Sequence, residues 1–83
     1  MYNRFISNTL KKDFYIQADT TGAVRLLRNE DTVVFVQADI NYVEVNEEHF
    51  HVERKELENG ATFVAFWRKK KLIGTIELRK EEE

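Results

Sequence analysis

The chain has 83 residues, of which 42% are hydrophobic and 34% are charged, and it contains no cysteine and no proline. This length limits the chain to one small domain, and the composition is too apolar for a disordered chain and too polar for a membrane-spanning one. The lack of cysteine excludes a disulfide framework, a thiolate zinc site and a cysteine nucleophile. We therefore expect one cytoplasmic domain over residues 1–83, with no signal peptide and no membrane partner.

The formal net charge of −2 is unevenly distributed along the chain. Residues 41–60 carry six acidic and two basic side chains, whereas residues 61–83 carry six basic and four acidic ones. A near-neutral total is unfavourable for coating duplex nucleic acid but leaves room for a local basic contact. Residues 80–83 are typical of a frayed acidic tail.

An amphipathic helix is predicted over residues 1–12. Its apolar side chains recur at helical spacing: Tyr2, Phe5, Ile6 and Leu10. Lys11 and Lys12 would complement the negative end of the helix dipole. A helix of about three turns is marginal alone, so it would need to dock against a sheet.

Residues 13–79 show a β pattern with short runs of Val, Ile and Thr between turn formers. A three-residue loop is predicted at Thr20-Thr21-Gly22, with Gly22 in the left-handed conformation, and another at Asn29-Glu30-Asp31. These loops align the even-numbered apolar residues Phe14, Ile16, Ala18, Val24, Leu26, Val34 and Val36 on one face.

The inward residues become odd-numbered at Val43 and Val45, which predicts a bulge or sharp bend near Ala38-Asp39-Ile40. A loop over residues 46–49 would then place Val45 opposite Phe50 and Val43 opposite Val52. Both pairs would point inward.

The pair Asn59-Gly60 predicts a two-residue hairpin loop, which places Val52 opposite Trp67 and His51 opposite Arg68. A four-residue loop over 68–71 then places Trp67 opposite Leu72 and Phe63 opposite Ile76. In this register the inward face consists of Phe50, Val52, Ala61, Phe63, Ala65, Trp67, Leu72, Ile76 and Leu78.

The predicted fold is mostly β, all-β or α+β. About seven short antiparallel strands form an up-and-down meander, which curls into a small barrel or half-barrel beside the short N-terminal helix. No crossover is long enough for a parallel βαβ unit.

The opposite face of the sheet is the predicted protein-binding surface. It is an apolar band with charged neighbours, as at many interfaces: Ile40, Tyr42, Glu44, Glu53, Val64, Phe66 and Ile73. Alternatively, the N-terminal helix lies across this band and completes a second core layer.

Nucleic-acid binding is the alternative function, carried by the basic loop Arg68, Lys69, Lys70 and Lys71 and its aromatic neighbours. Small β barrels bind single strands by stacking bases along a positive groove. A lysine-rich turn also serves simply to keep a hairpin soluble.

His49 and His51, which are two residues apart, have a spacing typical of metal ligands, and Glu44 or Glu53 could be a third ligand. The predicted neighbour Arg68 would repel a cation, so we expect no metal. The sequence contains no phosphate-binding glycine loop, nucleophile elbow or His-Glu-x-x-His motif, so we expect no enzyme and no cofactor.

The sequence thus favours a non-enzymatic protein-binding module, either a small regulator, an inhibitor or an assembly component. Its partner would be a protein of unknown identity. Self-association into a homodimer is left open, and nucleic acid is the less favoured partner.

Overall fold

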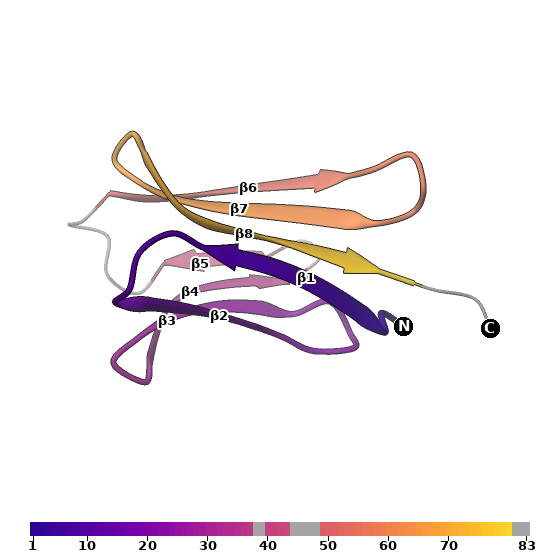
Figure 1. Cartoon of the computed structure of the whole chain (residues 1–83), viewed down its shortest axis with the longest axis horizontal. Helices are drawn as coiled ribbons and strands as arrows, with labels where there is room; N and C mark the ends of the chain where they lie inside the picture. The colour runs from indigo at the N-terminus through magenta and orange to yellow at the C-terminus, as the bar shows by residue number, and fades with distance from the viewer. Residues whose placement is uncertain (38–39, 44–48, 81–83) are drawn as a thin grey trace.

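The structure, a computed structural model, describes residues 1–37, 40–43 and 49–80, with 40–43 described by their backbone alone. These residues form eight strands (Figure 1): β1 (Arg4–Thr9), β2 (Phe14–Ala18), β3 (Val24–Arg28), β4 (Asp31–Gln37), β5 (Ile40–Val43), β6 (Phe50–Glu56), β7 (Thr62–Arg68) and β8 (Lys71–Arg79). Every pairing between them is antiparallel. The prediction of a mostly β, antiparallel fold is therefore confirmed.

The strands form two four-stranded sheets. These sheets do not close into the barrel that the sequence predicts. The first sheet has the order β1-β8-β7-β6 and the second β2-β3-β4-β5. The chain changes sheet between β1 and β2 and again between β5 and β6, so these consecutive strands lie at the edges of different sheets. Figure 1 shows β6, β7 and β8 in one layer and β2, β3 and β4 in the other.

The core lies between the two sheets. Its fully buried side chains come from the central strands of both layers: Val24, Leu26, Val34 and Val36 from the second sheet, and Val64, Phe66, Ile73, Ile76 and Leu78 from the first. Burying these apolar side chains against each other is the main term that stabilises a two-layer sandwich. Among the described residues there is no helix long and apolar enough to cross a membrane.

The β2–β3 hairpin forms as the sequence predicts. Gly22 has a φ of 93° in the three-residue loop, a conformation that glycine adopts without steric cost. Ile16 lies opposite Leu26, and Ala18 lies opposite Val24, as expected.

The β3–β4 turn reaches the predicted alignment by a different route. The loop has two residues rather than three, Asn29 and Glu30, with φ values of 53° and 70°. Positive φ at both positions is typical of the tight hairpin turns that match strand twist. A bulge after Leu26 compensates for the shorter loop, so that Leu26 still lies opposite Val34.

β4 and β5 pair on either side of the predicted bulge or sharp bend near Ala38-Asp39-Ile40. β5 folds back on β4 in an odd register that places Val34 opposite Val43, so an even position faces an odd one. The predicted pairing of Val43 with Val52 is therefore wrong, because the two residues belong to different sheets. Residues 38, 39 and 45 lie outside the described residues.

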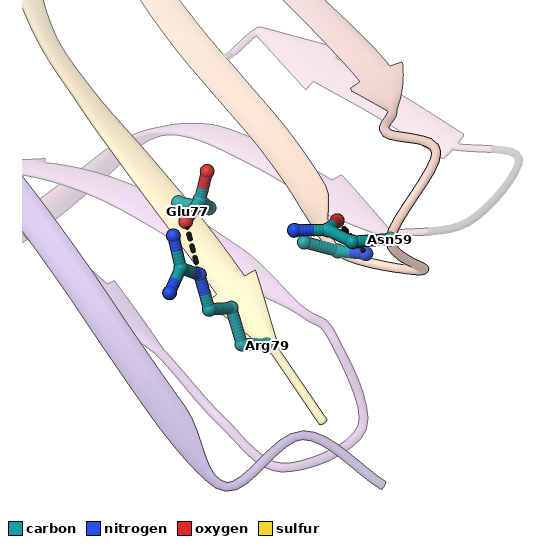
Figure 2. A network of polar contacts seen from close by, with 4 residues as sticks. Asn59, Glu77 and Arg79 are labelled. Carbon is teal, nitrogen blue, oxygen red and sulfur yellow. Dashed lines mark hydrogen bonds and ion pairs between the residues drawn. The ribbon is translucent and has the colours of Figure 1, made fainter. Parts of the chain in front are cut away.

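The β6–β7 hairpin differs by one residue from the prediction. Its loop has three residues, and the amide of Leu57 donates to the carbonyl of Ala61 at 2.8 Å. Within this loop Gly60 has a φ of 84°, and the side-chain oxygen of Asn59 accepts the amide of Ala61 at 3.0 Å (Figure 2). Val52 therefore lies opposite Phe66.

This one-residue difference exchanges the two faces of β7, because side chains alternate along a strand. Phe66 is completely buried, whereas the predicted core residues Phe63 and Trp67 are only half-buried on the outer face. His51 lies opposite Trp67 and not opposite Arg68.

The β7–β8 hairpin confirms one predicted pair and contradicts the other. Trp67 lies opposite Leu72, as expected, but a bulge at Ile73 shifts the remaining register. Phe63 therefore faces Glu77, and Val64 faces Ile76. Figure 2 shows Glu77 accepting a hydrogen bond from the guanidinium of Arg79.

Residues 1–12 form strand β1 and its flanks, and the predicted helix is wrong. β1 pairs with β8 along its whole length, from Arg4 opposite Arg79 to Thr9 opposite Gly74. A Cβ atom at Gly74 would lie 2.8 Å from the carbonyl oxygen of Asn8, so the glycine permits this close approach.

Tyr2 joins the two sheets at the start of β1. Its buried hydroxyl lies 2.7 Å from that of Thr62 in the first sheet, and its amide donates to the carbonyl of Thr20 beside the second at 2.9 Å. Its ring fills the space above Gly22, where a Cβ atom would lie 2.9 Å away. The apolar residue at position 2 is therefore part of the core, unlike the rest of the predicted helical stripe.

Candidate protein-binding site

Three apolar members of the predicted protein-binding band are not on the surface. Val64, Phe66 and Ile73 are at most 1% exposed and form the centre of the core, so their assignment to a binding surface is wrong. The cause is the one-residue difference in the β6–β7 register together with the bulge in β8.

Of the remaining members of that band, only Glu53 has a described side chain. Glu53 is exposed on the outer face of the first sheet, opposite Ala65. The side chains of Ile40 and Tyr42 and all of Glu44 lie outside the described residues.

Exposed apolar side chains gather instead on one side of the sandwich. Among the described residues, every exposed large hydrophobic side chain belongs to β1, β2 or a residue close to β1: Met1, Phe5, Ile6, Leu10 and Tyr15. β1 and β2 are the edge strands of the two sheets on this side. We call these two strands, with Phe5, Ile6, Leu10 and Tyr15, the open side.

All six residues of β1 are exposed, which is unusual for a strand in a small sandwich. Phe5 and Ile6 point to opposite faces of the sheet, as successive strand residues do, and are 40% and 42% exposed. Neither face of this strand is therefore buried, although β2 of the other sheet contacts part of it.

The backbone of β1 presents a row of outward-facing hydrogen-bonding groups. The amide of Leu10 donates to the carbonyl of Ile73 at 2.8 Å, which continues the ladder to β8. Because antiparallel ladders alternate between bonded and non-bonded pairs, the amide and carbonyl groups of Phe5, Ser7 and Thr9 face away from β8. These are the groups that an added strand would bond.

β6, the other edge of the same sheet, is protected against such pairing. Its last four residues, 53–56, are all charged. Arg54 points inward with only 19% of its side chain exposed, and its Nη1 atom has no hydrogen-bond partner. Charges on an edge, including inward-pointing ones, are a common means of preventing strand addition.

β2 differs from β1, although β2 has no charged residue and β1 has only one, Arg4. Phe14 and Ile16 are 5% and 7% exposed, so one face of β2 is buried in the core. A hollow of about 310 Å³ lies where β2 begins, lined by Lys12, Asp13, Phe14, Tyr15, Leu27, Asn29 and Glu30. This volume is at the low end of the range for small-molecule sites.

The basic residues of the nucleic-acid alternative divide into two groups. Lys69, Lys70 and Lys71 are exposed, with Lys69 at a φ of 58° in the β7–β8 turn. Arg68 is half-buried, with its guanidinium 5.3 Å from the ring centre of Phe14. Phe66, which the predicted register places on the outward face, is in the core, so it cannot stack on a base.

Arg68 and Arg28 close one end of the core. The guanidinium of Arg28 lies 5.5 Å from the ring centre of Phe14 and 6.0 Å from that of Phe50, and the two rings pack edge to face at 6.0 Å. Each sheet supplies one arginine and one phenylalanine. These cation–π contacts give both arginines a structural role at this end of the core.

The histidines are exposed and do not form a metal site in the described part of the chain. His49 precedes β6 at a φ of 56°, and its carbonyl accepts the amide of Lys69 at 3.1 Å. No group of three or more His, Asp or Glu side chains among the described residues is placed to hold a metal ion.

Comparisons with protein-family models, with curated proteins and with solved structures found no match for this chain.

Proposed function

We propose that the chain is a non-enzymatic protein-binding module that takes up an extended segment of a partner protein along the free edge of β1. The observation that carries the proposal is the exposure of all six β1 residues. After Arg4 the edge is uncharged, from Phe5 to Leu10. In strand addition, backbone hydrogen bonds supply affinity, and side chains on the two faces supply specificity.

The contrast between the two edges of the first sheet supports this choice. β6 carries charges at residues 53–56, one of them pointing inward, whereas β1 carries a single charge, at its first residue Arg4. An open, uncharged edge is an aggregation hazard unless it has a partner. The exposed Phe5 and Ile6 would then contact the two faces of the added strand.

A proline at position 7 tests the proposal. The amide of Ser7 faces away from β8, so Ser7→Pro leaves the β1–β8 ladder intact but removes an outward donor and blocks the edge. Glu56→Pro is the control, because it places a proline on the other edge strand of the same sheet. The amide of Leu57 bonds to Ala61 of the neighbouring chain segment, so the amide of the preceding residue, Glu56, points to the free edge of β6. Both variants should retain the wild-type circular dichroism spectrum.

Selection from a displayed library of random twelve-residue peptides supplies the readout. Wild-type protein and Glu56→Pro should enrich the same peptides, and Ser7→Pro should enrich none of them. Equal enrichment by Ser7→Pro, or no enrichment by the wild type, would refute binding along β1.

Single-stranded nucleic acid is the second candidate, because Lys69, Lys70 and Lys71 are exposed side by side. A labelled thymidine 20-mer should then bind with a steep salt dependence, and replacing the three lysines by glutamate should abolish binding. No binding at low salt would exclude this candidate.

A further inference from the structure

We infer that the partner segment bound along β1 has an uncharged centre and acidic residues at the end that lies beside the β1–β2 turn. This inference rests on the proposed function and specifies the chemistry of the partner. It follows from how charge is distributed at the end of β1 and at the adjacent end of β8.

The charges at this end of the first sheet are mostly positive. No charged residue lies between Phe5 and Leu10, and two exposed or half-buried lysines, Lys11 and Lys12, follow directly. Residues 1–12 contain no carboxylate side chain. A segment that follows the edge of β1 toward its end therefore meets uncharged surface first and positive charge last.

The β7–β8 turn adds further positive charge at the same end. The bond from the Leu10 amide to the Ile73 carbonyl keeps the end of β1 beside the start of β8. Figure 1 shows the turns that follow β1 and β7 at the same end of the molecule. We call the five lysines of these two turns the basic end: Lys11, Lys12, Lys69, Lys70 and Lys71.

The described carboxylates near this end are fewer than the five lysines of the basic end. Asp13 in the β1–β2 turn and Glu30 in the β3–β4 turn line the same hollow as Lys12. Asp31 is the first residue of β4. Residues 44–48, which include three glutamates, lie outside the described residues.

A second copy of the chain is a poorer occupant than an acidic segment. Antiparallel pairing of two β1 strands about Ser7 would place Arg4 of one copy opposite Leu10 of the other, next to Lys11. Both ends of the paired strands would then bring positive charges together with no carboxylate between them. Like charges at neighbouring cross-strand positions destabilise pairing, whereas opposite charges stabilise it and steer the encounter.

The composition of peptides selected from the displayed library tests this inference. Peptides enriched by the wild type, and not by Ser7→Pro, should concentrate Asp and Glu at one end and uncharged residues in the centre. Lys11→Glu/Lys12→Glu should lose these peptides and enrich ones that carry Lys or Arg at that end. For one synthesised binder, replacing its acidic residues by amides should weaken binding about five- to tenfold at low salt.

Each other outcome overturns the inference in a distinguishable way. If the peptides that are lost with Ser7→Pro show no charge bias, the partner segment does not need acidic residues at its end, but strand addition along β1 is retained. A dimer in light scattering that Ser7→Pro dissociates would identify a second copy as the occupant. Binding of the thymidine 20-mer that Lys11→Glu/Lys12→Glu abolishes would assign the basic end to nucleic acid, and no peptide binding would refute the proposed function itself.

Discussion

Truncating Phe66 tests the register on which the description of both faces of β7 depends. Its side chain is 0% exposed and is the largest of the fully buried side chains in the described part of the chain. Replacing a buried Phe by Ala costs about 3–5 kcal/mol, because the transfer free energy is lost and a cavity remains. A chain of 83 residues has a free energy of unfolding on the order of 4–12 kcal/mol, so Phe66→Ala should unfold at much lower urea concentration.

Phe63 provides the matched control, because it lies on the same strand with its side chain on the opposite, half-buried face. Phe63→Ala removes the same atoms but leaves no enclosed cavity, so it should cost about 1–2 kcal/mol. Urea unfolding followed by far-ultraviolet circular dichroism measures both values. If Phe66→Ala does not fold, Phe66→Leu retains most of the side-chain volume and should still cost more than Phe63→Leu.

The opposite order would refute the reasoning. A larger loss for Phe63→Ala than for Phe66→Ala would mean that Phe63 and Trp67 face the core and that the β6–β7 loop has two residues. Comparable losses for the two variants would also contradict the structure, because it makes only one of the two faces of β7 a core face.

Two further predictions concern polar contacts. Tyr2→Phe should lower the free energy of unfolding by about 1–3 kcal/mol, because it leaves the buried hydroxyl of Thr62 unpaired. Adding Thr62→Val should recover most of that loss. If urea unfolding shows that the effects of the two substitutions are additive, the hydrogen bond is excluded. The hydroxyl of Thr21, with the backbone amides of Ala23 and Thr21, holds the pKa of Asp19 below its ordinary value. A carboxylate whose pKa is lowered by folding stabilises the fold at pH values above its unfolded-state pKa of about 4, and this contribution is lost as the pH falls through the folded-state pKa. The stability of Asp19→Asn should therefore fall less steeply in acid than that of the wild type. Identical slopes of stability against pH for the two proteins would contradict the contact.

The second sheet could be predicted from sequence because its determinants are local. Gly22 specifies the left-handed position of the β2–β3 loop, and the alternation of apolar residues fixes which face is buried. At the β3–β4 turn, two departures from the prediction cancelled. A shorter loop at Asn29 and Glu30 was offset by a bulge after Leu26, so the apolar match survived.

The first sheet could not be predicted in the same way, because two apolar registers compete in β7. Residues 63–67 are apolar on both faces, so the burial pattern does not decide between Phe63 and Phe66. The loop length decides, and the pair Asn59-Gly60 is compatible with two or three loop residues. The bulge at Ile73 is a second register shift that no turn signal marks.

The candidate site was missed because residues 1–12 satisfy a helical spacing as well as a strand. Tyr2, Phe5, Ile6 and Leu10 form a helical stripe, but in the structure only Tyr2 is buried. Short apolar runs are ambiguous between helix and strand, and the pairing with β8 is a contact between the two ends of the chain. The lack of charge from Phe5 to Leu10 does not identify an open edge by itself, because the central strands β4 and β7 contain uncharged runs of similar length.

In the proposed function, the uneven protection of the edges would let this small sandwich bind a partner segment without aggregating. β6 and its charges prevent pairing on one side, so any strand addition to the first sheet is directed to β1. Lys11 and Lys12 at the end of β1 then disfavour a second copy through like charge, and they favour a segment of opposite charge. The same lysines that keep identical chains apart would therefore select the partner, and reversing their charge should weaken selection and increase self-association together.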